Sequence, residues 1–335
     1  MRIALVTDAW YPQVNGVVRT WNRVIEECEG LGHEFLVVAP RDFRTVPLPT
    51  YPEIRIAIAP GRGLKRRLDA FRPEAVHIAT EGPLGLAARR LCLKRGWPFT
   101  TSYHTKFPEY VAARLPVPLR WGYAAMRCFH RPSTAVLVAT ASIRRELSGW
   151  GLTHLVDWTR GVDTALFRPD GPKAHEGEGP LFLYVGRVAV EKNIRAFLDL
   201  DLPGTKAVVG DGPQLPELNR RYPDVLFPGA KFGEELAAWY RSADVFVFPS
   251  RTDTFGLVLL EALASGVPVA AFHVPGPLDV VGMDGPGVLG DDLGRAATAA
   301  IGIGPEACRA HAMRFSWTAC ARLFLDNLAP LPATR

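Results

Sequence analysis

The sequence lacks the marks of a membrane-spanning, secreted or disulfide-built protein. No apolar run among its 335 residues is long enough to cross a bilayer, and residues 1–8 lack the long apolar segment and small-residue cleavage site of a signal peptide. Five cysteines occur, widely spaced and with no Cys-x-x-Cys pair. We therefore expect a cytoplasmic protein with buried free thiols, all on predicted helices, at Cys28, Cys92, Cys128, Cys308 and Cys320.

Several nucleotide-binding and metal-binding motifs are also missing. There is no Gly-x-Gly-x-x-Gly after a predicted strand and no Walker loop, which disfavours dinucleotide and P-loop proteins. No cluster of His, Cys and Asp predicts a metal site. Asp199-Leu200-Asp201 resembles an Asp-x-Asp metal motif, but it lies before Pro203-Gly204 and is interpreted as a turn. The sequence therefore predicts no bound metal.

The positive charge is unevenly distributed. Residues 1–170 contain 24 basic and 15 acidic residues, a balance of +9, whereas residues 171–335 contain 15 and 19, a balance of −4. A basic half next to a mildly acidic half indicates that the first half meets an anionic partner. The anionic partner could be a membrane surface, a phosphorylated acceptor or nucleic acid. The sequence has no known nucleic-acid-binding motif.

The chain is long enough for two hydrophobic cores, and its pattern repeats. Short apolar runs alternate with amphipathic segments in both halves, separated by the Gly- and Pro-rich stretch 170–180. Buried parallel strands are predicted at 3–7, 35–39, 75–78, 99–102, 135–139, 181–185, 206–209, 225–227, 245–248 and 269–272. Helices are predicted at 19–31, 84–95, 141–148, 193–200, 216–221, 233–242 and 257–265, and residues 275–290 are predicted to be a loop.

The predicted architecture is α/β, with two Rossmann-like domains facing each other across a cleft. Residues 1–170 form the first domain and residues 171–315 form the second. A final helix, 316–335, is placed to cross back to the first domain. Because ligands bind outside the carboxyl ends of strands in open α/β sheets, the loops at these ends are the candidate site.

The stretch 249–266 carries the most chemical information. A strand ends there, a polar loop follows, and a helix starts near Phe255-Gly256-Leu257, where backbone N–H groups suit a diphosphate. Asp253 lies in the loop and Glu261 about two turns into the helix. These acids could accept hydroxyls of a sugar and of a ribose. By spacing alone, a helix-start charge and an ordinary helical glutamate explain them better.

Two further loops follow strand ends. Arg187 and Lys192 lie after strand 181–185, where a guanidinium fork and an ammonium could clamp a leaving diphosphate. A solvated loop explains these two residues slightly better on their own. His104 follows strand 99–102 and could bond a sugar hydroxyl or move a proton, with a structural hydrogen bond as the alternative.

Together these segments resemble the retaining family 4 glycosyltransferases of the GT-B fold over nearly the whole chain. Asp253 and Glu261 match that family's Glu-x7-Glu element, with Asp in place of the first Glu. Arg187 and Lys192 match its diphosphate pair and His104 its cleft histidine. Similar short motifs are Tyr11-Pro12-Gln13-Val14-Asn15-Gly16, Gly161-Val162-Asp163, Gly210-Asp211-Gly212-Pro213 and Phe315-Ser316-Trp317. In the first of these, many members have Gly-Gly where this chain has Asn15-Gly16.

The resemblance implies hexose transfer from a nucleotide diphosphate sugar, GDP-mannose before UDP-hexose, to an acceptor hydroxyl with retention. It implies no cofactor and no metal, with charge on the diphosphate met by Arg187, Lys192 and the helix start. Asp253 and His104 would hold the sugar and Glu261 the ribose. The residues implied to contact the donor through their loops are Asn15, Gly16, Thr254, Phe255, Gly256 and Leu257.

The sequence does not identify the acceptor, and a lipid-linked hydroxyl is one candidate. Basic segments at 61–67 and 89–95, with the mixed aromatic and basic segment 119–129, suit peripheral contact with the inner face of a membrane. Solvated helix faces explain them about as well. Two other functions remain as alternatives: a sugar-nucleotide epimerase of the same fold, and a basic nucleic-acid-binding protein.

Overall fold

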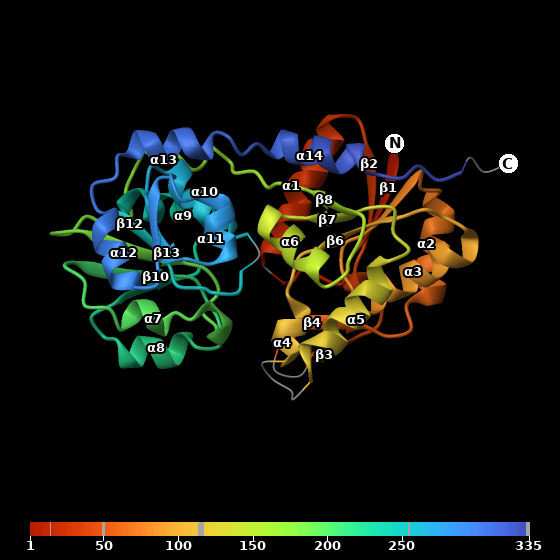
Figure 1. Cartoon of the computed structure of the whole chain (residues 1–335), viewed down its shortest axis with the longest axis horizontal. Coiled ribbons are helices and arrows are strands. Elements are labelled where there is room, and N and C mark those ends of the chain that lie inside the picture. The colour runs from red at the N-terminus through yellow and green to blue at the C-terminus, as the bar shows by residue number, and fades with distance from the viewer. Residues whose placement is uncertain (14, 49–50, 113–116, 254, 333–335) are drawn as a thin grey trace. The chain divides into compact units, whose positions relative to one another are not determined.

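The computed structural model describes residues 1–13, 15–48, 51–112, 117–253 and 255–332, with only the backbone of 51–53 and 110. The chain forms two compact units (Figure 1). Unit 1 contains Met1–Thr159 and Trp317–Arg335, and unit 2 contains Arg160–Ser316. The chain therefore passes from unit 1 to unit 2 at residue 160, before the 170–180 segment. The last helix belongs to unit 1. Within the described residues, no helix combines the length and the apolar character that a bilayer-spanning segment needs.

Unit 1 is built on a parallel sheet of six strands in the order β2-β1-β5-β6-β7-β8. The strands are β1 (Arg2–Val6), β2 (Glu34–Val38), β5 (Ala75–Ile78), β6 (Thr100–Tyr103), β7 (Val136–Val138) and β8 (Leu155–Asp157). A separate antiparallel pair consists of β3 (Thr45–Leu48) and β4 (Tyr51–Ala57). The strand order reverses between β1 and β5, so the carboxyl ends of these two strands mark the switch point of the sheet.

Helices cover both faces of this sheet. The elements are α1 (Gly16–Gly30), η1 (Pro40–Asp42), α2 (Gly61–Phe71), α3 (Pro83–Arg95), α4 (Phe107–Ala112), α5 (Leu119–His130), α6 (Ala141–Gly149) and α14 (Trp317–Asp326). On one face, Ala4 and Val6 of β1 pack with Leu64 of α2 and Leu84 of α3. On the other face, α14 packs on α1, and Thr318 Oγ1 donates to a Glu27 carboxylate oxygen at 2.7 Å.

Unit 2 repeats the plan, with a parallel six-stranded sheet in the order β11-β10-β9-β12-β13-β14. Its strands are β9 (Leu181–Val185), β10 (Thr205–Val209), β11 (Leu226–Gly229), β12 (Val245–Phe248), β13 (Val269–Phe272) and β14 (Gly287–Gly290). Its helices are η2 (Val190–Lys192), α7 (Arg195–Leu198), α8 (Leu215–Arg221), α9 (Gly233–Ser242), α10 (Leu257–Ala264), α11 (Pro275–Val280), α12 (Leu293–Ala300) and α13 (Pro305–Ala312). The order reverses between β9 and β12, which sets the second switch point.

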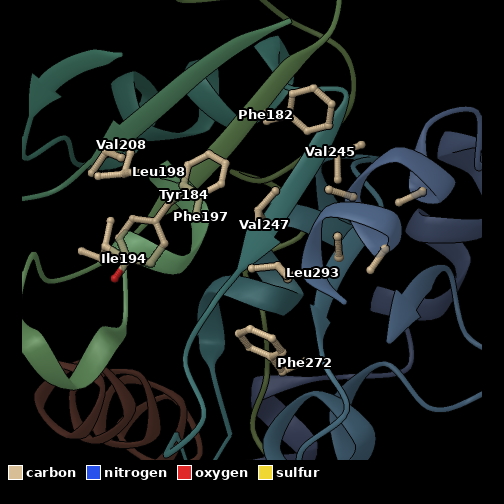
Figure 2. Packing of buried hydrophobic residues seen from close by; sticks show 14 of the residues in the cluster. Phe182, Tyr184, Ile194, Phe197, Leu198, Val208, Val245, Val247, Phe272 and Leu293 are labelled. Carbon is tan, nitrogen blue, oxygen red and sulfur yellow. The ribbon is translucent and has the colours of Figure 1, made fainter. Parts of the chain in front are cut away.

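Figure 2 shows one face of the unit 2 core, where Phe182 and Tyr184 of β9 lie with Val245 and Val247 of β12. Phe197 of α7 covers this face together with residues of α12. The alternate residues of these strands are buried as well, against the helices of the opposite face. Burial on both faces explains why the strands are continuous apolar runs in the sequence. The expected α/β fold with two parallel-sheet domains is confirmed.

Two expectations are wrong. Residues 275–290, expected to be a loop, contain α11 and β14. Their glycines serve packing, because a Cβ on Gly285 would lie 1.7 Å from Val281 O and one on Gly287 would lie 2.5 Å from Val269 O. The thiols were all expected to be buried, and all five do lie on helices, but Cys128 is exposed on α5.

Candidate active site

In unit 2, the loops predicted to bind the donor lie together at the switch point of the sheet. One loop follows β9 and carries Arg187 and Lys192. The other follows β12 and carries Asp253. Asn193 Nδ2 donates to Pro249 O at 3.1 Å and ties the two loops together. Residues far apart in the sequence thus meet because β9 and β12 are neighbours in the sheet.

Lys192 and Asp253 form an ion pair across these loops. Lys192 Nζ lies 2.5 Å from Asp253 Oδ1, and the two side chains are 23% and 19% exposed. The other oxygen, Asp253 Oδ2, is buried and accepts no hydrogen bond within the described residues. A buried carboxylate oxygen without a donor is costly, so it is a ready acceptor for a ligand hydroxyl. The pair therefore presents an ammonium and a carboxylate oxygen side by side.

The backbone around Arg187 is held by close glycine contacts. Tyr184, whose side chain is fully buried, donates from its hydroxyl to Arg187 O at 2.9 Å. Gly210 has φ +152° and lies so close to this loop that an added Cβ would be 1.9 Å from Gly186 O. At Gly212 (φ +156°), a Cβ would be 2.4 Å from Val188 O. The two glycines of the Gly210-Asp211-Gly212-Pro213 motif thus let the backbone pass close to the Arg187 loop and fix the course of that loop.

Helix α10 starts at this edge without a side-chain cap. Its N-cap residue is Gly256, with φ +86°, which no other residue type adopts as readily. Within the described residues, the first-turn N–H groups, beginning at Leu257, therefore donate to no capping side chain. Phe255 is buried in unit 2, with its ring 6.4 Å from that of Phe315, so its side chain serves packing. Thr254 lies outside the described residues.

Glu261 is on α10 and only 3% exposed. Tyr240 of α9 donates its hydroxyl proton to Glu261 Oε2 at 2.9 Å. A buried carboxylate needs such a donor, and the tyrosine fixes its orientation. No local pattern in the sequence predicts this role of Tyr240, because Tyr240 and Glu261 lie on different helices.

His104, in unit 1, follows β6 and belongs to a hydrogen-bonded chain of side chains. Its Nε2 lies 3.1 Å from Trp21 Nε1 and 2.9 Å from Ser102 Oγ. An indole N–H only donates, so Nε2 accepts and the ring is neutral with its proton on Nδ1. Ser102 Oγ also lies 3.1 Å from Nε2 of His77, whose pKa burial lowers to about 3. Sequence reasoning assigned no role to Trp21, Ser102 or His77, although His77 lies one residue before the end of the neighbouring strand β5.

Asn15 and Gly16 start α1. The Asn15 side chain is the N-cap: Oδ1 accepts from Val17 N at 3.0 Å and Val18 N at 3.1 Å, and Nδ2 donates to Gln13. Its amide is thus engaged in holding the helix start. Gly16 has open space where a Cβ would be. Of the two, the backbone near Gly16 is the more available to a ligand.

Asp8 occupies the switch point of unit 1, a position the sequence analysis did not assign. Its carboxylate accepts from Leu84 N at 2.9 Å, Gly85 N at 3.2 Å and Thr80 Oγ1 at 2.9 Å. Burial raises the pKa of Asp8. The carboxylate caps α3 from another strand, and Gly82 leaves room for it, since a Cβ there would be 2.4 Å from the Asp8 carboxyl carbon. Asp8 thereby fixes the loop between β5 and α3.

Comparison with known proteins gives two family matches. Residues 14–166 match the model described as Glycosyltransferase Family 4, and residues 179–303 match that of Glycosyl transferases group 1. The chain is 31% identical over 308 residues to a GDP-mannose-dependent alpha-mannosyltransferase of Mycobacterium tuberculosis (strain CDC 1551 / Oshkosh), covering 84% of this chain and 81% of that protein. It is 29% identical over 318 residues to an alpha-monoglucosyldiacylglycerol synthase of Streptococcus pneumoniae (strain ATCC BAA-255 / R6), covering 82% and 72%.

Among solved structures, the chain resembles sucrose-phosphate synthase from Thermosynechococcus elongatus. The TM-score is 0.81 at 20% identity, and the match covers 97% of each chain. At this identity the likeness concerns the fold, which is the GT-B fold of these transferases.

Proposed function

The chain belongs to the family 4 glycosyltransferases, and from that premise we propose that it transfers a hexose with retention from a nucleotide diphosphate sugar, GDP-mannose in preference to UDP-hexose. The name of the mycobacterial relative, a GDP-mannose-dependent transferase, supports this choice of donor. The acceptor is proposed to be a hydroxyl of a lipid-linked molecule. The observation that carries the proposal is the Lys192–Asp253 pair at the switch point of unit 2, beside the uncapped start of α10.

The pair accounts for both ends of the donor. Asp253 Oδ2 accepts a sugar hydroxyl, and the Lys192 ammonium donates to an oxygen of the diphosphate. Arg187 and the first N–H groups of α10 add positive potential where negative charge grows as the glycosidic bond breaks. Because these groups are fixed before the reaction, they stabilise the transition state without reorganising. In the proposal Glu261, whose orientation is set by Tyr240, holds the ribose.

Retention requires the acceptor to bond on the face that the diphosphate leaves. The bond from the anomeric carbon to the phosphate oxygen breaks, and the acceptor oxygen bonds to that carbon on the same side. The acceptor proton passes to an oxygen of the departing diphosphate. In the proposal His104 holds the sugar, and its Nδ1 proton, set by the Trp21 contact to Nε2, donates to a sugar hydroxyl.

A lipid-linked acceptor is supported by an exposed apolar surface on α4 and α5. Trp121 is 62% exposed, and Phe107, Val111 and Leu119 of these two contacting helices are exposed as well. Tryptophan at such a position suits the headgroup level of a membrane. The name of the streptococcal relative, an alpha-monoglucosyldiacylglycerol synthase, also supports a lipid acceptor.

The basic segment 61–67 contributes less than its composition indicates. Lys65 Nζ lies 2.7 Å from a carboxylate oxygen of Asp69, and Arg67 lies 3.0 Å from Asp42. Arg95 also forms an ion pair with Asp69, with its Nη2 2.5 Å from Asp69 Oδ1. Cations that already pair with acids add little attraction for an anionic surface. The apolar surface of α4 and α5 is therefore the main proposed contact.

A donor screen tests the proposed function. The full chain is incubated with GDP- and UDP-hexoses and an acceptor lipid extract, and nucleotide release and glycosylated product are both measured. The largest kcat/KM is expected with GDP-mannose. An altered free sugar nucleotide without transfer product would instead indicate an epimerase. Faster turnover with every UDP-hexose tested would overturn the donor assignment.

A further inference from the structure

Unit 1 contains a pocket at the edge of its sheet opposite the carboxyl ends of the strands. Its volume is about 730 Å³. It is lined by the end of α5, the turn after it, one residue of α3 and the turn after α6: Arg89, Ala124, Arg127, Cys128, His130, Arg131, Pro132, Gly151, Leu152 and Thr153. The two turns lead into β7 and β8, so they lie at the amino ends of these strands. His104 and Asp8, in contrast, follow the carboxyl ends of strands.

Two of the three arginines of the pocket are fixed by neutral partners. Arg89 donates to Cys128 O at 2.8 Å and to Phe129 O at 3.0 Å, in the last turn of α5. Arg127 donates to Trp150 O at 2.7 Å, just after α6. A carbonyl holds a guanidinium in place without cancelling its charge. The two side chains are therefore ordered and still fully cationic.

The charge of the pocket is not balanced by its lining. No Asp or Glu is among the lining residues. One carboxylate touches the lining, that of Glu81, which lies 3.2 Å from His130 Nε2 and is buried with it. Arg131 is exposed, and within the part of the chain that the structure describes its side chain forms no ion pair or hydrogen bond. Three guanidiniums thus face one carboxylate.

We propose that this pocket binds the phosphoryl group of an anionic ligand, supplied by a soluble phosphate monoester or by a phospholipid headgroup. Guanidinium forks match the paired oxygens of a phosphoryl group, and three of them provide more donors than one carboxylate could use. Ala124, Pro132 and Leu152 form apolar walls for the organic part of the ligand. The proposal does not depend on the transfer reaction, because none of the residues proposed for that reaction lines this pocket.

Cys128 provides a direct readout, because it lines the pocket and the other four cysteines are buried. The full chain is reacted with a maleimide, and the rate of labelling is followed by intact mass. Inorganic phosphate and glycerol phosphate are added in one arm, and sodium chloride of equal ionic strength serves as the reference. Vesicles of phosphatidylglycerol or of phosphatidylcholine form the second arm. Binding is expected to slow labelling in a saturable manner.

Two variants separate a built site from general surface charge. Arg131→Ala is expected to raise the half-protecting ligand concentration about tenfold, the size of one charge-assisted hydrogen bond. Ala124→Trp keeps every charge and fills the pocket, and it is expected to weaken protection as well. Arg220→Ala removes another exposed arginine, on α8 of unit 2, and is expected to behave as wild type. Thermal unfolding confirms that each variant is folded.

The arms identify the source of the phosphoryl group. Protection by soluble phosphates supports a monoester, and protection by phosphatidylglycerol vesicles alone supports a lipid headgroup. Absence of protection in both arms overturns the proposal, as does equal protection in the Arg131→Ala, Ala124→Trp and Arg220→Ala variants. Labelling uses neither donor nor acceptor, so a failed transfer assay leaves this result intact.

Discussion

Replacing Lys192 by alanine removes the ammonium that lies 2.5 Å from Asp253 Oδ1. Two effects then act on the transition state. The charge-assisted hydrogen bond to the departing diphosphate is lost, which costs about 1.5–3 kcal/mol. The Asp253 carboxylate stays in place without its cation and repels the growing charge. We therefore expect kcat/KM to fall at least about tenfold, and about a hundredfold at the upper end of this range.

The assay measures initial rates of nucleotide release over a range of donor concentrations. Lys173→Ala is the matched control, since it removes an exposed lysine from the 170–180 segment of the same unit. Thermal unfolding checks that both variants are folded. If Lys192→Ala keeps kcat/KM within about threefold of wild type, the proposed role of the pair in charge stabilisation is wrong.

A double-mutant cycle separates the two roles of Asp253. If Asp253 only orients Lys192, then Asp253→Asn has no further effect on a chain that already carries Lys192→Ala. If Oδ2 accepts a sugar hydroxyl, Asp253→Asn lowers kcat/KM in both backgrounds. The coupling energy of the cycle reports the contact between the two side chains.

Three other outcomes are expected. EDTA leaves turnover unchanged, because Arg187, Lys192 and α10 supply the positive charge, and activity that is lost and then restored by Mg²⁺ or Mn²⁺ would contradict this. The pKa of His77 is about 3 in the fold and about 6.5 unfolded, so the unfolded chain binds an extra proton as pH falls below about 6.5 and stability drops by about 1.4 kcal/mol per pH unit. Urea titrations between pH 6.5 and 5 measure how the free energy of unfolding changes with pH. His77→Gln is expected to make this dependence less steep, and an unchanged dependence would show that His77 is not buried in its neutral form. Trp121→Ala lowers co-sedimentation with phosphatidylglycerol vesicles, whereas Phe232→Ala, an equally exposed aromatic of unit 2, does not; equal binding by both variants argues against the α4–α5 surface.

The strands of unit 2 were the most predictable part of the fold. Leu181–Val185, Val245–Phe248 and Val269–Phe272 are continuous apolar runs, and the structure has the same bounds. Such runs are required where both faces of a strand are buried. β8 was missed, because Leu155–Asp157 has three residues at a sheet edge and carries no such signal.

Glycine-rich stretches misled the prediction. Because glycine favours turns, Gly285 and Gly287 contributed to the prediction of a loop at 275–290. In the structure each is a place where another backbone oxygen lies too close for a side chain. A single sequence does not distinguish glycine needed for conformation from glycine needed for close approach.

At the candidate site, the sequence located the loops but not the contacts. Lys192 and Asp253 were each predicted, yet their ion pair depends on β9 and β12 being neighbours in the sheet. The hydrogen bonds from Tyr240 to Glu261 and from Trp21 to His104 likewise join residues of different elements. These partners come from elements that no local pattern connects.

The return of α14 to unit 1 has a consequence for synthesis of the chain. The indole N–H of Trp158 donates to Cys320 O at 3.0 Å, and the Phe324 ring lies 5.2 Å from that of Trp21. These contacts complete one face of unit 1, but the ribosome produces α14 only after all of unit 2. Unit 2 is continuous in sequence, so it can fold while the apolar surface around Trp21 is still uncovered. Unit 1 can therefore close its core only after α14 has been synthesised and has left the ribosome, and until then this surface of the nascent chain stays uncovered.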